Sequence, residues 1–93
     1  METLSIVLKI NGENKTFETD FISIDTLESV FDLADKSDAL GYRKMITAYI
    51  DLLVKIFNEQ FTKEDIRKGI DARALITETT RLIEQITADF SGK

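Results

Sequence analysis

The most constraining feature of the sequence is an alternating pattern of side chains that ends at an Asn-Gly dipeptide. Apolar side chains occupy every second position from Leu4 to Ile10, which is the period of a β-strand. The Asn11-Gly12 dipeptide that follows predicts a tight turn, because both central residues of a type I′ turn need positive φ. We therefore expect a β-hairpin over about residues 3–21.

The parity of the hairpin places two later residues on the apolar face of the first strand. The loop could consist of Asn11-Gly12 or run from Asn11 to Asn14, and both choices put Phe17 and Thr19 on that face. A two-stranded sheet is marginal in water by itself. The apolar face must lie on helices, or the strand edge must pair with another chain.

The rest of the chain has helical periodicity, over about residues 26–36, 42–60, 63–68 and 72–89. With no proline and no linker composition, the prediction is a single, mostly helical α+β domain over residues 1–93. The residues expected to face inward are Leu27, Val30, Phe31 and Ala34 in the first helix, Met45, Ile46, Tyr49, Ile50, Leu52, Leu53, Ile56 and Phe57 in the second, and Leu75, Ile76, Thr79, Leu82, Ile83, Ile86 and Phe90 in the last.

Capping patterns predict where the first two helices begin. Asp25 is expected to cap the first helix, with Glu28 as its reciprocal acidic partner three residues on. Ser37 or Asp38 can cap the second helix, and Gly41 weakens any continuation of the first.

The segment from residue 58 to residue 75 holds the next helix start and a stop. Thr62 is a natural cap and Asp65 can close a capping box, while Phe61 can pack on Ile66 as a hydrophobic staple. Gly69 is expected to end this helix in the left-handed conformation.

The same devices then repeat before the last helix. Asp71 is expected to cap it, and Ile70 can staple to Leu75. Glu64 and Lys68 form an i,i+4 pair on the preceding helix. These caps and staples fix how two helices begin, so no catalytic role is needed to explain why the residues are there.

The composition removes most routes to catalysis. The chain has no histidine and no cysteine, so the commonest general base, the commonest metal ligand and the thiol nucleophile are all missing. The carboxylates fall in no EF-hand spacing, and the four glycines form no phosphate-binding loop. We expect no enzyme activity, no cofactor and no metal site.

Charge argues against nucleic acid as a partner. The net charge is −5, whereas phosphate binders rely on clustered Lys and Arg. The first 38 residues carry nine acidic side chains and three lysines, a charge of −6, which leaves +1 for the remainder. No apolar run is long enough to span a membrane and no signal peptide is evident, so a cytosolic location is the default expectation.

Two quoted stretches resemble a known family. The opening "LKINGENKTFETDFIS" and the later "LLVKIFNEQFTKEDIRKGIDARALI" are similar to segments of the tail assembly chaperones of long-tailed, non-contractile bacteriophages and prophages of low-GC Gram-positive bacteria. The family-motif positions are Phe57, Gln60, Phe61, Thr62, Asp65, Gly69, Asp71, Ala72 and Arg73.

The resemblance implies a non-enzymatic role in tail assembly. Such chaperones bind and solubilise the tape measure protein in the cytoplasm of the bacterial host, are displaced as the tail tube protein polymerises, and are absent from the mature virion. Many are also made in a longer form by programmed frameshifting, and the added part recruits the tail tube protein. The terminal Ser91-Gly92-Lys93 is compatible with a slippery codon run.

A coat along an extended client also implies a homo-oligomer. The acidic first helix and the basic short helix offer complementary head-to-tail surfaces. The candidate self-association residues are Glu28, Asp32 and Asp35 on one side and Lys63, Arg67 and Lys68 on the other.

Two other functions stay open at this point. A small acidic interaction module, such as a nucleic-acid mimic that inhibits a DNA-binding protein, would use the acidic row but is disfavoured by the basic one. An acyl carrier protein has similar size and acidity, but it needs an Asp-Ser-Leu attachment site, and here the order is Ser37-Asp38.

Overall fold

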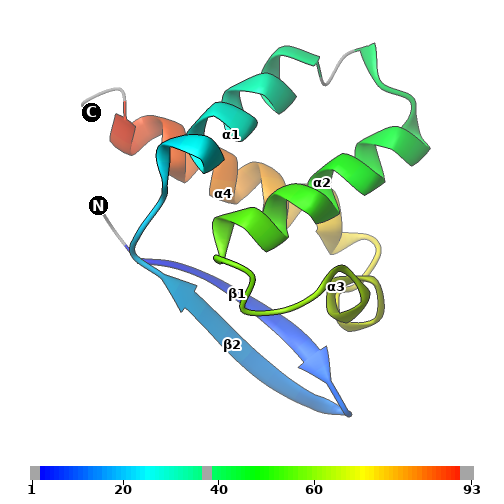
Figure 1. Cartoon of the computed structure of the whole chain (residues 1–93). Coiled ribbons are helices and arrows are strands. Elements are labelled where there is room, and N and C mark those ends of the chain that lie inside the picture. Colours follow the sequence, from blue (N-terminus) through cyan, green and yellow to red (C-terminus); the bar gives the residue numbers. More distant parts are fainter. Residues whose placement is uncertain (1–2, 37–38, 91–93) are drawn as a thin grey trace.

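The computed structural model describes residues 3–36 and 39–90, with side chains up to residue 88. An antiparallel β-hairpin is followed by four α-helices in the described part of the chain, which confirms the predicted α+β class (Figure 1). The elements are β1 (Leu4–Ile10), β2 (Glu13–Thr19), α1 (Ile24–Lys36), α2 (Tyr42–Ile56), α3 (Lys63–Gly69) and α4 (Ala74–Phe90).

The hairpin has the two-residue turn. Asn11 and Gly12 take φ values of 55° and 82°, and Ile10 pairs with Glu13 across them. The register sets Ile6 opposite Phe17, so the predicted parity is confirmed.

The apolar face of the hairpin forms the floor of the core. The side chains of Leu4, Ile6 and Leu8 are buried, and Figure 1 shows all the helices on one side of the hairpin. The central helix α2 packs against α1, α3 and α4, and α3 lies beside β1. The remaining buried apolar side chains are Val30, Leu33, Tyr49, Ile50, Leu52, Leu53, Ile56, Phe57, Phe61, Ile66, Leu75, Leu82 and Ile86.

The cap predicted for α1 is wrong by two residues. Ser23 Oγ, rather than the Asp25 carboxylate, accepts a hydrogen bond from the Thr26 backbone N–H at 3.1 Å. The Ser23 hydroxyl also donates to Thr26 Oγ1 at 3.0 Å. This bond satisfies the Thr26 hydroxyl, which can therefore be buried.

The inward face of α1 also differs from the prediction. Thr26, Val30 and Leu33 are buried, whereas Phe31 is 38% exposed and Ala34 is exposed. The apolar stripe of α1 is wider than the side that the core covers, so periodicity alone could not select which residues turn inward.

Helix α2 begins at Tyr42, with Gly41 at the N-cap, and ends at Ile56 rather than near residue 60. It stops because Asn58 and Glu59 both adopt the left-handed conformation, with φ values of 57° and 61°. The proposed caps Ser37 and Asp38 lie outside the described residues.

Two apolar residues expected in the core are exposed instead. Ile46 on α2 and Ile76 on α4 both lie at the surface. Each stands at the edge of a stripe that continues into the core at Ile50 and Leu75. The side chain of Phe90, expected to face inward, lies outside the described part.

The capping box of α3 is confirmed, but its predicted stop is wrong. Thr62 Oγ1 accepts from the Asp65 N–H at 3.1 Å, and the Asp65 carboxylate accepts from the Thr62 N–H at 2.9 Å. Gly69 is not left-handed, because Gly12 is the one glycine with positive φ among the described residues. The helix runs through Gly69, and its C-cap is Ile70, whose φ is −117°.

Asp71 caps a turn just before α4. Its Oδ1 accepts from the Arg73 N–H at 2.8 Å, and the Ala74 N–H bonds the Asp71 carbonyl at 2.8 Å. Helix α4 therefore begins at Ala74 rather than at residue 72. The predicted Glu64–Lys68 ion pair is present at 3.0 Å.

Candidate functional site

Depressions in the surface lie along the junction of α1 and α2. One is mainly apolar and has a volume of about 370 Å³. Two others, which are more polar and lie toward residues 58 and 59, share Lys55 with it. The apolar depression is lined by Ser29, Asp32, Leu33, Lys36, Leu40, Ala48, Asp51, Leu52 and Lys55. We call this depression the α1–α2 furrow.

The floor of the furrow is apolar. Leu33 and Leu52 are buried, and Leu40 and Ala48 pack partly buried against the core. Because Ala48 has only a methyl side chain, little projects from α2 into the furrow, so that a bound segment of another protein could approach the α2 backbone closely. Apolar surface within a polar rim is the composition expected of a binding groove rather than of a solvated face.

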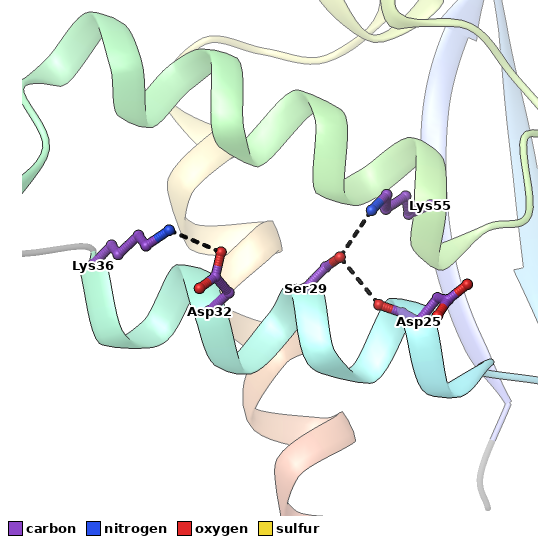
Figure 2. A network of polar contacts seen from close by, with 5 residues as sticks. All are labelled: Asp25, Ser29, Asp32, Lys36 and Lys55. Carbon is purple, nitrogen blue, oxygen red and sulfur yellow. Dashed lines mark hydrogen bonds and ion pairs between the residues drawn. The ribbon is translucent and has the colours of Figure 1, made fainter.

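The rim carries both charges in a defined arrangement. Lys55 Nζ on α2 donates to Ser29 Oγ on α1 at 2.9 Å, and the Ser29 hydroxyl donates to the Asp25 carbonyl at 3.1 Å (Figure 2). Further along α1, Lys36 Nζ lies 3.1 Å from Asp32 Oδ2. The two lysines and Asp32 are exposed and Ser29 is half-buried, so their contacts contribute little to stability and can be exchanged for contacts with a guest.

Asp51 links the furrow to α3. Its Oδ1 lies 3.1 Å from Lys63 Nζ. The pair lacks the alignment of a hydrogen bond, although that oxygen is withdrawn from solvent. Lys63 therefore compensates the charge of this carboxylate, and its buried Oδ1 receives no directed hydrogen bond.

Among the described residues, several carboxylates form exposed ion pairs and none belongs to a metal-binding cluster. Residues 3–36 and 39–88 contain no group of three carboxylates that could hold a metal ion. The pKa of Asp71 is lowered by its side-chain hydrogen bond with Arg73, and then by the Arg73 backbone N–H. Both side chains are exposed, Arg73 by 92% and Asp71 by 51%, as in a solvated ion pair.

The furrow is a candidate binding surface, and comparison with known proteins indicates the process in which the chain takes part. A family model described as "Phage tail chaperone protein" matches residues 1–92. The chain belongs to this family of phage tail chaperones. Comparison with curated proteins and with solved structures found no match. None of the described helices of the tail chaperone is long and apolar enough to cross a membrane.

The aromatic motif residues of the tail chaperone fasten the hairpin to the helices. Phe61 packs edge-on against Phe17 of β2, with ring centroids 4.9 Å apart, and its centroid lies 5.6 Å from that of Phe57. Gln60 Nε2 donates to the Glu18 carbonyl at 2.7 Å.

The polar motif residues order the α3 segment. Thr62 and Asp65 form the capping box, Gly69 lies against β1, and the Asp71 carboxylate receives both side-chain and backbone donors of Arg73. Ala72 is exposed in the turn before α4. None of the nine motif residues lines the α1–α2 furrow.

The candidate self-association residues lie on α1 and α3, at separate places in the molecule (Figure 1). Several have partners within the chain: Asp32 with Lys36, Lys63 with Asp51, and Lys68 with Glu64. Asp32 lines the furrow and Glu28 lines a neighbouring depression, so part of the acidic row belongs to the candidate binding surface.

Sequence reasoning missed the most distinctive residues of the furrow, Ser29 and Lys55. Each is a polar residue beside an apolar row, which is typical of an ordinary solvated position. A usable signal was the row Ala48, Asp51 and Lys55 at helical spacing beside the buried Leu52. Only the packing of α1 beside α2 turns these rows into a furrow.

Proposed function

We propose that this tail chaperone binds amphipathic helical segments of the tape measure protein in the α1–α2 furrow and keeps them soluble during tail assembly. The role is non-enzymatic. The family match supports it, and the observation that carries it is the furrow itself, an apolar floor between two helices with a rim of both charges. A third helix placed between two others buries its apolar stripe in this way.

The charges on the rim favour a guest helix with flanking residues of both signs. Asp32 and Asp51 can receive basic side chains of the guest, and Lys36 and Lys55 can receive acidic ones. The Ser29–Lys55 bond must open or widen for the guest to enter. It is a single exposed bond, so opening it costs little free energy.

The direct test is co-expression of the tail chaperone with its cognate tape measure protein. Wild type should raise the soluble fraction of the tape measure protein several-fold, whereas Ala48→Arg should not, because a long charged side chain would fill the furrow. Thr77→Arg, on an exposed position of α4, is the matched control and should act like wild type. Equal solubility with and without the chaperone would refute the proposal.

The acidic-mimic alternative is less well supported. Glu28, Asp32 and Asp35 stand on one helix, but Lys36 neutralises Asp32, and Lys55 reaches Ser29 in the same region. A mimic of a phosphate backbone needs an unbroken acidic row. Salt-sensitive capture of a DNA-binding enzyme, with no effect on tape measure solubility, would reverse this preference.

The same proposal extends to the fate of the protein. It acts in the cytoplasm of the bacterial host, of the Gram-positive type suggested by the resemblance, and leaves when the tail tube protein polymerises around the tape measure. Mass spectrometry of purified virions should then detect tube and tape measure peptides and no peptides of the chaperone. Stoichiometric chaperone in virions would refute this part.

A frameshift-extended form is proposed to recruit the tail tube protein. It rests on the family resemblance, because Ser91-Gly92-Lys93 lies outside the described residues. The gene should show a slippery heptamer near these codons and an overlapping downstream frame. If both are present, the extended product should bind the tube protein and the 93-residue form should not.

We also propose head-to-tail self-association between the acidic α1 and the basic α3. Arg67 is the basic residue to test first, because Lys63 and Lys68 have acidic neighbours in their own chain. This contact is electrostatic and should weaken strongly between 0.05 and 0.5 M salt, because the Debye length falls to roughly 5 Å or less over that range. Arg67→Glu should abolish it, and association unchanged by that substitution would refute it.

A further inference from the structure

The two edges of the hairpin differ in how they are covered. On the β1 side, α3 packs alongside, and Arg81 Nη2 of α4 donates to the Ser5 carbonyl at 3.0 Å. On the β2 side, Figure 1 shows no helix or strand of the described chain, and the side chain of Gln60 bonds the Glu18 carbonyl near the end of the strand.

The register identifies which backbone groups of β2 point outward. Ser5 and Glu18 face each other, and each carbonyl accepts from outside the hairpin, so this is a non-hydrogen-bonded pair. Every second residue of β2 repeats this geometry, so the backbone groups of Asn14 and Thr16 also point away from β1. Both residues are exposed.

We propose that the outer edge of β2 pairs with the β2 of a second copy of this chain, antiparallel, about a two-fold axis at Thr16. This register pairs all seven residues of the strand, from Glu13 to Thr19. Thr16 stands opposite itself, Asn14 opposite Glu18, and Lys15 opposite Phe17. The product is a four-stranded sheet with the helices of both copies on one face.

The sequence of β2 suits a second copy because this register is self-complementary. The Asn14 amide can donate to the Glu18 carboxylate twice, once on each side of the axis, and the aliphatic stem of Lys15 can lie along the half-buried ring of Phe17. No like charges face each other directly in this strand pairing, which lies wholly within the described residues. Gln60 releases the Glu18 carbonyl, which then accepts the Asn14 N–H of the second copy.

This contact is separate from the proposed chaperone role and from the head-to-tail contact. Backbone hydrogen bonds carry it, so it should persist at high salt, whereas the α1–α3 contact should not. Failure of one contact therefore leaves the others to be judged on their own tests.

The first test compares two proline variants of the full chain by sedimentation in 1 M NaCl. Thr16→Pro removes an outward N–H from β2, and Val7→Pro removes one from β1 at the residue directly opposite. Wild type and Val7→Pro should dimerise, and Thr16→Pro should dimerise at least about ten-fold more weakly, because two intermolecular bonds are lost at the axis. A monomeric wild type at millimolar concentration, or equal weakening by both prolines, would overturn the proposal.

The second test does not depend on proline being tolerated. The chain has no cysteine, so Thr16→Cys introduces a single thiol whose symmetry mate lies about 5.5 Å away between Cα atoms, within disulfide range. Asn14→Cys is the matched control, because its mate would lie about 13 Å away along the strand. Mild oxidation should cross-link the Thr16→Cys variant into covalent dimers and should leave the Asn14→Cys variant uncross-linked.

Two outcomes of this oxidation would overturn the proposal. One is equal cross-linking of the Thr16→Cys and Asn14→Cys variants, which would indicate random collision rather than a fixed register. The other is that the Thr16→Cys variant stays monomeric under the same oxidation, which would show that the two thiols are not held close together.

Discussion

Gly69 at the end of α3 lies so close to Lys9 of β1 that a Cβ at residue 69 would stand 2.8 Å from the Lys9 carbonyl oxygen. The same Cβ would be 3.3 Å from the Leu8 Cβ. The glycine is therefore required by the approach of a helix to a strand edge, and not by a left-handed φ. Its absence of a side chain lets α3 cover the β1 edge.

Gly69→Ala should consequently destabilise the chaperone by about 1–3 kcal/mol, because backbone cannot yield as a flexible side chain would. Gly69→Val should cost more. Urea denaturation measures the change, with Gly41→Ala as the control, since a Cβ there meets nothing within 4 Å and the cost should stay below about 1 kcal/mol. A Gly69→Ala midpoint equal to wild type would show that the contact relaxes freely.

Asn58 combines a backbone role with a side-chain role, and two substitutions separate them. Its φ is 57°, and Nδ2 donates to Thr19 Oγ1 at 3.0 Å and to the Phe21 carbonyl at 3.3 Å. Asn58→Gly keeps the permitted φ but loses the two hydrogen bonds, which should lower the free energy of unfolding by about 1 kcal/mol. Asn58→Ala also places an alanine in the left-handed conformation, which should cost about 1 kcal/mol more. Equal unfolding free energies for the two variants would contradict this division.

Phe61 should be costly to truncate. It is buried between Phe17 and Phe57, so Phe61→Ala should cost about 3–5 kcal/mol by loss of burial and creation of a cavity. Phe21→Ala is the control, since Phe21 is 64% exposed and should change the unfolding free energy by less than about 0.5 kcal/mol. Equal thermal unfolding midpoints for Phe61→Ala and Phe21→Ala would contradict this assignment.

The Asp71–Arg73 pair should be visible in a pH titration. The folded pKa of Asp71 lies below its usual value, chiefly because the Arg73 side chain stabilises the carboxylate. The stabilising contact is therefore present above the ordinary aspartate range and is lost as pH falls through the lowered pKa. NMR titration of the Asp71 carboxyl should give a higher midpoint in Arg73→Gln than in wild type. An unshifted midpoint would mean that the pair is not populated in solution.

Local patterns predicted the strands and helices, because each pattern depends on residues that lie close together in the sequence. The Asn11-Gly12 turn, the parity of Phe17 and the Thr62–Asp65 capping box depend on backbone dihedrals and on spacings of a few residues. The motif around Phe57 to Arg73 similarly indicated the family that the match over residues 1–92 shows.

Local patterns could not predict the furrow, because its lining residues come from two different helices. Ser29 and Lys55 are 26 positions apart, and nothing near either residue predicts that they meet.

What the sequence by itself determined was the order of the elements, the hairpin turn and the parity of its two strands, and the lack of histidine and cysteine. The tertiary structure alone decided which side of α1 is buried, that Gly69 must be small, and where the furrow opens. The physical reason is that turns, caps and periodicity arise from short-range sterics and hydrogen bonds. Burial, close approach and concavity depend on which surfaces are brought together by the minimum of the whole chain's free energy.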